Sequence, residues 1–200
     1  MKKVAVFLLV LALAALVFYF GSFTLAKSET HMSAQTGGVR NANATFNNGF
    51  CIYPDSPFGK MVAAELKARG HKVLTLSALV KCDGQFLAVW IEWFNISYSP
   101  IIARGQVRVI AVYSSTGDPA HYLSYRNATN KERALIAFNR TGIPQFQAYI
   151  LADVSDESWG LIGLRGYRDY LMRQAAKAIA ARAGRFELEE KTQKAALNKS

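Results

Sequence analysis

The pattern of hydrophobic positions begins with an unbroken apolar run from Val4 to Phe20, directly after Lys2 and Lys3. These 17 residues exceed the usual core of a signal peptide and reach the short end of a membrane span. The run has no polar face, which a core helix of a globular protein would have. We therefore expect residues 1–26 to be a signal peptide or a signal anchor.

The two alternatives differ in what happens near Ala26. Thr24 and Ala26 are small residues at the spacing that suits cleavage after Ala26. Without cleavage, residues 4–25 would lie in the membrane. Lys2 and Lys3 would then stay in the cytoplasm, and the C-terminus would lie outside. Both alternatives predict an extracytoplasmic protein, either anchored by a single pass or secreted.

Beyond this segment the chain divides into three parts. Residues 27–49 are rich in Ser, Thr, Asn and Gly and lack an apolar period, which predicts a flexible polar stalk. Residues 50–186 carry the remaining periodic segments and predict one globular α+β domain. Residues 187–200 are charged and polar and predict a frayed tail.

Two helices are predicted by period and capping. The segment 57–69 starts with Ser56 as N-cap and Pro57 in the first helical position, and Gly70 follows it. The segment 166–183 ends at Gly184 and carries an apolar, alanine-containing stripe that suits close packing on a sheet. This stripe also includes Arg182, so we expect the helix to extend beyond its supporting surface after Ile179.

Several segments predict strands, with the longest signal at 85–99. Phe86, Trp90 and Phe94 would lie on one face of that strand, and Ile91 and Trp93 on the other, as in a strand covered on both sides. The other expected strands are 50–53, 71–80, 107–113, 121–125 and 145–154, and a capping box at 129–132 predicts a short helix ending before residue 142. The fold class is therefore α+β: an antiparallel or mixed sheet of about five strands with two main helices packed on one face, preceded by the N-terminal helix.

Composition supports a packed globule. Hydrophobic residues make up 51% of the chain and aromatic residues 12%. The formal net charge is +10, but the basic residues are scattered and form no Lys/Arg-rich run. We therefore expect no nucleic-acid partner. The charge predicts either a solvated basic surface or attraction to anionic lipid, acidic glycans or an acidic partner.

Acceptor triplets for N-linked sugar are unusually frequent. Five of the nine asparagines open an Asn-x-Ser/Thr triplet, where roughly one would be expected by chance from this composition. A bulky sugar keeps its asparagine on the solvent side. The predicted glycosylation sites are Asn43, Asn95, Asn127, Asn139 and Asn198.

The chain has two cysteines, Cys51 and Cys82. In an exported protein an even pair predicts a disulfide. This bond would connect the region before the first helix to the end of the following strand. Neither cysteine has a second cysteine at metal-ligand spacing or a neighbouring histidine, which argues against a metal-binding or catalytic thiol.

The sequence predicts no catalytic, cofactor-binding or metal site. The three histidines are far apart, and no HExxH or Gly-x-Ser-x-Gly motif occurs. Gly160, Gly163 and Gly166 resemble a loose anion-binding loop but lack the Lys-Ser/Thr of a nucleotide loop, so a turn that allows tight packing is preferred. Glu92 is expected to reach water or pair with an arginine.

These observations favour an extracytoplasmic, membrane-anchored and N-glycosylated envelope protein with a binding or assembly role, through other envelope proteins or self-association. One alternative is an exported hydrolase with a site assembled from Asp118, His121 and Asp153. A second alternative is an accessory subunit of a membrane complex.

Overall fold

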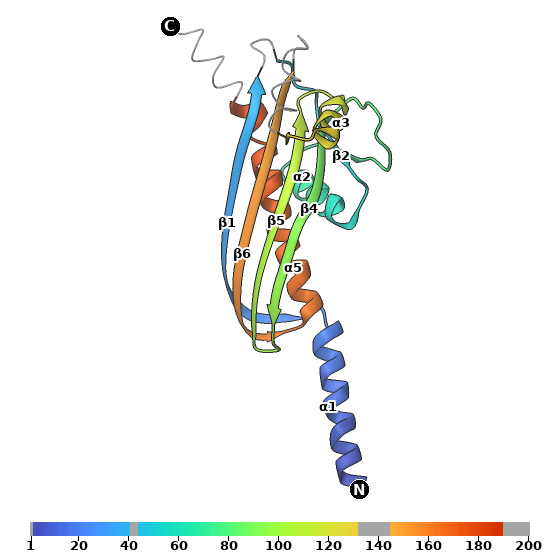
Figure 1. Cartoon of the computed structure of the whole chain (residues 1–200), viewed down its shortest axis with the longest axis vertical. Coiled ribbons are helices and arrows are strands. Elements are labelled where there is room, and N and C mark those ends of the chain that lie inside the picture. Colours follow the sequence, from blue (N-terminus) through green and yellow to red (C-terminus); the bar gives the residue numbers. More distant parts are fainter. Residues whose placement is uncertain (1, 41–43, 132–144, 190–200) are drawn as a thin grey trace.

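The computed structural model describes residues 2–40, 44–131 and 145–189. They form a mixed α+β domain with an apolar helix at the N-terminus (Figure 1). The helices are α1 (Lys2–Phe20), α2 (Pro57–Ala68), α3 (Ala120–Asn127) and α5 (Leu164–Ala183). The strands are β1 (Thr24–Arg40), β2 (Phe50–Tyr53), β3 (Val73–Thr75), β4 (Gln85–Tyr98), β5 (Ile102–Ser114) and β6 (Phe146–Ile162).

One mixed sheet organises the domain, as the sequence predicts, with six strands rather than about five. The strand order is β1-β6-β5-β4-β2-β3. Among the four long strands β1, β6, β5 and β4, each strand is antiparallel to its neighbours, whereas the short β2 runs parallel to both β4 and β3. Because β2 pairs only with the first four residues of β4, the sheet is six strands wide at one end and four at the other.

The hydrophobic core lies between the sheet and the two main helices, α2 and α5, which pack against the same face (Figure 1). The predicted caps of α2 are confirmed: the Ser56 hydroxyl accepts a hydrogen bond from the Gly59 N–H at 3.0 Å, and Gly70 has a φ of +87°. Small side chains let α5 approach the sheet closely. Ala180 and Ala183 are buried, so the prediction that this helix extends beyond its support after Ile179 is wrong.

Residues 27–40 belong to β1, so the predicted stalk at 27–49 is wrong. Every residue of β1 pairs with β6. Small polar side chains of β1 on the α5 side of the sheet find partners on β6 and α5: the Ser28 and Ser158 hydroxyls lie 2.7 Å apart, and the Thr30 hydroxyl lies 2.6 Å from Asp156 and from Tyr170. A strand of this kind lacks the apolar alternation that marks a half-buried strand, because hydrogen bonds replace apolar burial.

The domain boundaries shift accordingly. Folded structure begins at residue 24 instead of residue 50, and residues 44–49 are also integrated, with Ala44 buried and the Asn47 N–H donating to the Ser115 carbonyl at 2.9 Å. Of the predicted tail at 187–200, residues 187–189 continue a short helical turn after α5. There the Gln85 amide donates to Glu187 at 3.3 Å.

A β-bulge in β4 changes which side chains share a face. The register with β5 shifts between Ile91 and Trp93, with Glu92 as the extra residue. Phe94 therefore packs with Ile91 on the helix-covered side, while Trp93 lies on the same side as Trp90. The prediction that Trp90 and Trp93 point to opposite faces is wrong, since strict alternation ends at the bulge.

The segment predicted as a strand at 121–125 is the helix α3 instead. The Asp118 carboxylate accepts a hydrogen bond from the Ala120 N–H at 2.9 Å and starts the first turn. Tyr122 and Tyr125, three residues apart, both contact Trp90 on the sheet. The other strand predictions differ in length, since β3 is shorter than 71–80 and β6 extends to Ile162. The helix predicted after residue 129 lies largely outside the described residues.

Candidate functional site

The predicted disulfide is present: Cys51 of β2 and Cys82 of the β3–β4 connection are bonded at 2.07 Å. Cys51 is buried, and the Cys82 N–H donates to the Gly117 carbonyl at 3.1 Å. The bond therefore fastens the long β3–β4 connection to the end of the sheet where α3 also packs. Its role is structural, because neither sulfur is a free thiol.

Two predicted sugar acceptors are within the described residues, and both are exposed. Asn95 lies on β4 and Asn127 at the end of α3. Asn43, Asn139 and Asn198 lie outside the described residues. Exposure meets the steric requirement for a sugar at Asn95 and Asn127, and glycosylation itself stays a prediction.

The three residues of the hydrolase hypothesis take separate structural roles. Asp118 starts α3, and Asp153 pairs with Arg108, with its Oδ1 2.7 Å from Nε. His121 is buried, and this burial lowers its pKa to about 4. Tyr125, one turn after His121, stacks on Tyr149, and Asp153 lies four residues, or about 13 Å, farther along β6. The geometry does not bring these three side chains into one cleft.

Gly163 and Gly166, at the start of α5, allow close packing. A Cβ on Gly163 would lie 2.1 Å from the Gly21 carbonyl oxygen. The Gly163 N–H donates to the Phe23 carbonyl at 2.9 Å, and the Gly166 N–H donates to that of Gly21 at 3.4 Å. The N–H groups of Gly163 and Gly166 therefore donate to the segment that follows α1 and are not directed at an anion. This supports the interpretation of the glycines as a turn that allows tight packing.

The sheet face opposite α5, here called the open face, is polar in its middle. Arg104 pairs with Glu157 at 2.6 Å, and Arg108 pairs with Asp153 while its guanidinium lies over the Trp93 ring at 5.7 Å. The hydrogen bond with Asp153 raises the pKa of Arg108. Two adjoining shallow depressions of about 380 and 370 Å³ occupy this region. Asn95 lines the larger one, so a sugar on Asn95 would cover it.

The outer edge of β4 is the more distinctive feature. Beyond Ala88 no strand in the described part of the chain pairs with this edge. The Ser99 N–H donates to the Ile102 carbonyl across the β4–β5 hairpin at 2.8 Å. Because inward and outward amides alternate along an antiparallel strand, the N–H groups of Phe94 and Ile96 point to the open edge. Such an edge is a template for another strand.

A groove of about 630 Å³ lies beside this edge, between β4 and the starts of α2 and α5. Its lining is largely apolar and includes Phe58, Ile91 and Met172. Its charged lining consists of two exposed cations, Arg165 and Arg168, and one carboxylate, Asp169, so the cations are in excess. Neither arginine forms an ion pair with a described residue, although the Arg168 guanidinium lies over the Phe94 ring at 5.5 Å.

Sequence reasoning missed this groove because its residues come from three separate elements. The one usable signal was that β4 is much longer than any strand available to pair with its outer edge. In the sequence, Arg165 and Arg168 lie at the start of the predicted helix 166–183 and belong to no recognisable motif. No protein-family model matches the chain, and none of the curated proteins shows significant similarity to it. The assignment of a function therefore rests on the geometry.

Proposed function

We propose that this chain is a single-pass membrane protein whose folded domain lies on the extracytoplasmic side and binds or assembles with other polypeptides. The first support is α1. Its segment Lys3–Phe20 has a mean hydropathy of 2.6 and none of it is buried in the domain, from which it projects (Figure 1). A helix of this length and composition suits a bilayer, and the lysines before it favour a cytoplasmic N-terminus.

Retention of α1 is supported by the residues that follow it. Cleavage after Ala26 would remove Thr24, Leu25 and Ala26 from β1, where they pair with the end of β6. It would also remove the carbonyls of Gly21 and Phe23, which accept hydrogen bonds from the start of α5. The signal-anchor alternative keeps these interactions, and the cleaved-signal alternative loses all of them.

The extracytoplasmic side is supported by the disulfide and by the exposed acceptor asparagines Asn95 and Asn127, since both suit an oxidising compartment. We expect protease added outside intact cells to digest the domain and leave a membrane-embedded fragment beginning at the original N-terminus. Mass spectrometry of that fragment is the measurement. Protection from external protease would contradict the orientation. A mature protein that starts at residue 27 would contradict the anchor.

The binding role is carried by one observation, the unpaired edge of β4 beside the apolar groove. An added strand would hydrogen-bond to the outward N–H groups of Phe94 and Ile96 and place an apolar side chain against Met172. Arg165 and Arg168 favour a segment that carries a carboxylate. The occupant is therefore an extended, apolar segment with an acidic residue, contributed by another polypeptide chain. An accessory role in a membrane complex is one form of this function.

Cross-linking in native membranes tests the groove. A photoreactive residue at Met172 should form cross-links that the same residue at Lys177, exposed on the same helix, does not form. Combining Arg165→Glu with Arg168→Glu should reduce the Met172 cross-links roughly tenfold, since two attractions of about 0.2–1 kcal/mol each become repulsions. Equal cross-linking at both positions, or no response to charge reversal, would rule out this groove as the binding site.

A further inference from the structure

Five exposed apolar side chains, here called the apolar base, gather at the end of the domain from which α1 emerges. They are Leu25, Ile101, Ile102, Trp159 and Leu161, with exposed fractions of 74, 60, 41, 39 and 49%. Outside α1 the described residues contain eleven exposed large hydrophobic side chains, and the other six are scattered over separate elements. Single exposed apolar residues are ordinary, but a contiguous group indicates a contact surface.

The strand register brings these residues together. Leu25 lies opposite Leu161 in the β1–β6 pair, and Ile102 lies opposite Trp159 in the β5–β6 pair. The Gly160 N–H donates to the Ile101 carbonyl at 3.0 Å, which holds the β4–β5 hairpin tip beside them. The apolar base is therefore a fixed part of the sheet, built from three strands and one hairpin.

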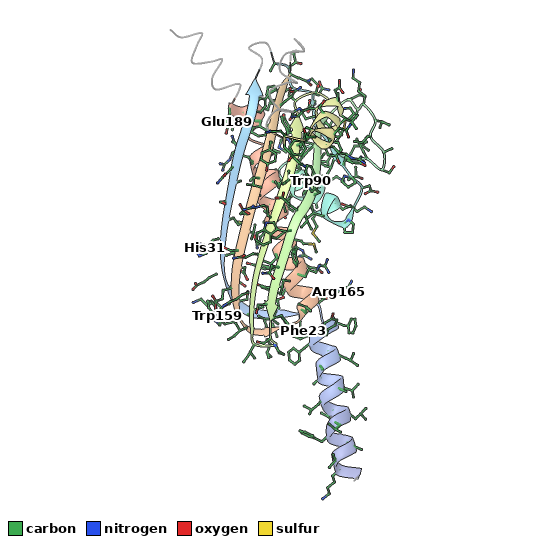
Figure 2. The ribbon with its side chains drawn as sticks, viewed as in Figure 1. Phe23, His31, Trp90, Trp159, Arg165 and Glu189 are labelled. Atoms are coloured by element: carbon green, nitrogen blue, oxygen red, sulfur yellow. A yellow bond between two sulfur atoms is a disulfide. The ribbon has the colours of Figure 1, made fainter. Side chains whose placement is uncertain are left out.

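The sheet bends so that this end passes beneath the domain. Figure 1 shows the first part of β1 and the last part of β6 turning across the base towards α1, and Figure 2 shows Trp159 and Phe23 near that end. Gly160 permits the bend: its φ is +138°, and a Cβ would lie 2.4 Å from the Leu25 carbonyl oxygen. The exposed strand ends thus lie beside the emerging end of α1, where a bilayer surface would be.

The length of α1 favours a domain held close to the membrane. The 18 residues Lys3–Phe20 span about 27 Å, slightly less than the roughly 30 Å hydrocarbon core. A short span is accommodated by local thinning or by sinking of the flanking residues. Leu25 lies only five residues after Phe20 and continues the apolar surface outward.

The residues next to the apolar base match the layering of a membrane interface. Lys27 lies opposite Trp159 in the β1–β6 register, and the Arg104–Glu157 pair lies farther from α1, on β5 and β6. The order along the open face is thus apolar, then aromatic with a cation, then fully charged. Tryptophan and lysine prefer the headgroup level, where an apolar body meets a polar environment.

We propose that the apolar base rests in the headgroup–acyl boundary of the bilayer that α1 crosses, so that the protein contacts the membrane through its sheet as well as its helix. This inference rests on the membrane anchorage proposed above. A second copy of the chain covering the same surface is the competing occupant. Lipid is favoured because the apolar base is continuous with a helix that itself needs lipid.

Quenching by brominated lipids tests the inference. The full chain is reconstituted into phosphatidylcholine vesicles with and without bromine near the top of the acyl chains, and the Trp159 signal is taken as the difference between wild type and Trp159→Phe. We expect quenching on the order of twofold, since interfacial segments lie about 5–10 Å into the headgroup boundary.

Leu25→Glu combined with Leu161→Glu should reduce this quenching and shift Trp159 emission to longer wavelength. Trp93→Phe, on the polar part of the open face, should leave the Trp159 signal unchanged.

Flotation of the same vesicles separates the two proposals. Protein that floats with the vesicles but shows no Trp159 quenching would overturn the lipid contact and leave the anchorage intact. Protein that does not float would overturn both. A third outcome is protein that floats but whose Trp159 emission moves to shorter wavelength only as the protein-to-lipid ratio rises. That result would show that a second copy covers the apolar base, and it would also overturn the lipid contact.

Discussion

Replacing Leu171 by alanine is expected to lower the free energy of unfolding by about 2–5 kcal/mol, the usual range for a buried leucine. Leu171 is fully buried on α5. One of its methyl groups fills the space that a side chain on Gly105 would occupy, since Leu171 Cδ1 lies 2.2 Å from the ideal Cβ position of that glycine. The backbone of β5 cannot easily move to refill the space, so most of the cavity should remain.

Denaturant unfolding of the full chain in detergent micelles measures this change. Leu74→Ala is the matched control, because Leu74 is 58% exposed on β3 and its truncation should cost well under 1 kcal/mol. If both variants lost the same small amount, α5 would not be packed on the sheet as described. The groove beside β4 depends on that packing, so the result also bears on the proposed binding site.

Replacing both Cys51 and Cys82 by serine is expected to destabilise the domain by up to about 3.7 kcal/mol, the chain-entropy value for a loop of this size. The two cysteines are 31 residues apart, and the loop between them contains all of α2. The unfolded chain without the bond gains many conformations, which is the main cause of the loss. Measured values are often smaller, because the unfolded chain retains some structure.

Thermal unfolding with and without reductant gives the measurement. The wild-type protein should unfold at a lower temperature once reduced. The double variant should have the same unfolding temperature as the reduced wild type, and added reductant should not change it. A double variant as stable as the oxidised wild type would show that the bond constrains a segment already held by α2 and β3. A reductant response in the double variant would point to an effect outside this bond.

The elements with strong local signals could be predicted from the sequence. The Ser56 cap, the Pro57 start and the Gly70 stop together specify α2, and the alanine-containing stripe specifies α5. These signals act within a few residues, so no knowledge of the rest of the fold is needed. The pairing of Cys51 with Cys82 follows from there being two cysteines in a chain that begins with an apolar segment.

The misassigned elements depend on distant partners. β1 lacks an apolar alternation because Ser28 and Thr30 face hydroxyls and a carboxylate from β6 and α5, and that compensation is invisible in the β1 sequence alone. Similarly, the apparent strand at 121–125 is a helix because its tyrosines pack on Trp90. The one-residue bulge at Glu92 reverses the face on which every later side chain of β4 lies, because side-chain alternation is counted residue by residue. The faces predicted for the second half of β4 were therefore wrong.

The candidate site was harder to predict than the fold. The groove exists because β2 stops pairing with β4 after Ala88, and strand lengths in space are not set by either strand alone. Arg165 and Arg168 carried no recognisable motif. The sequence contains no recognised catalytic motif, and its extracytoplasmic compartment stays a prediction. The structure adds the surface on which a binding hypothesis can be tested.

Only residues 21–23 separate α1 from β1, and the carbonyls of Gly21 and Phe23 accept hydrogen bonds from the start of α5. Such a connection acts as a rigid joint rather than a tether. If α1 crosses the bilayer, the domain cannot swing or reach outward, and the β4 edge keeps a constant height above the lipid. The molecules able to dock there would then be neighbours that travel in the same membrane plane, and encounters would be set by lateral diffusion in two dimensions.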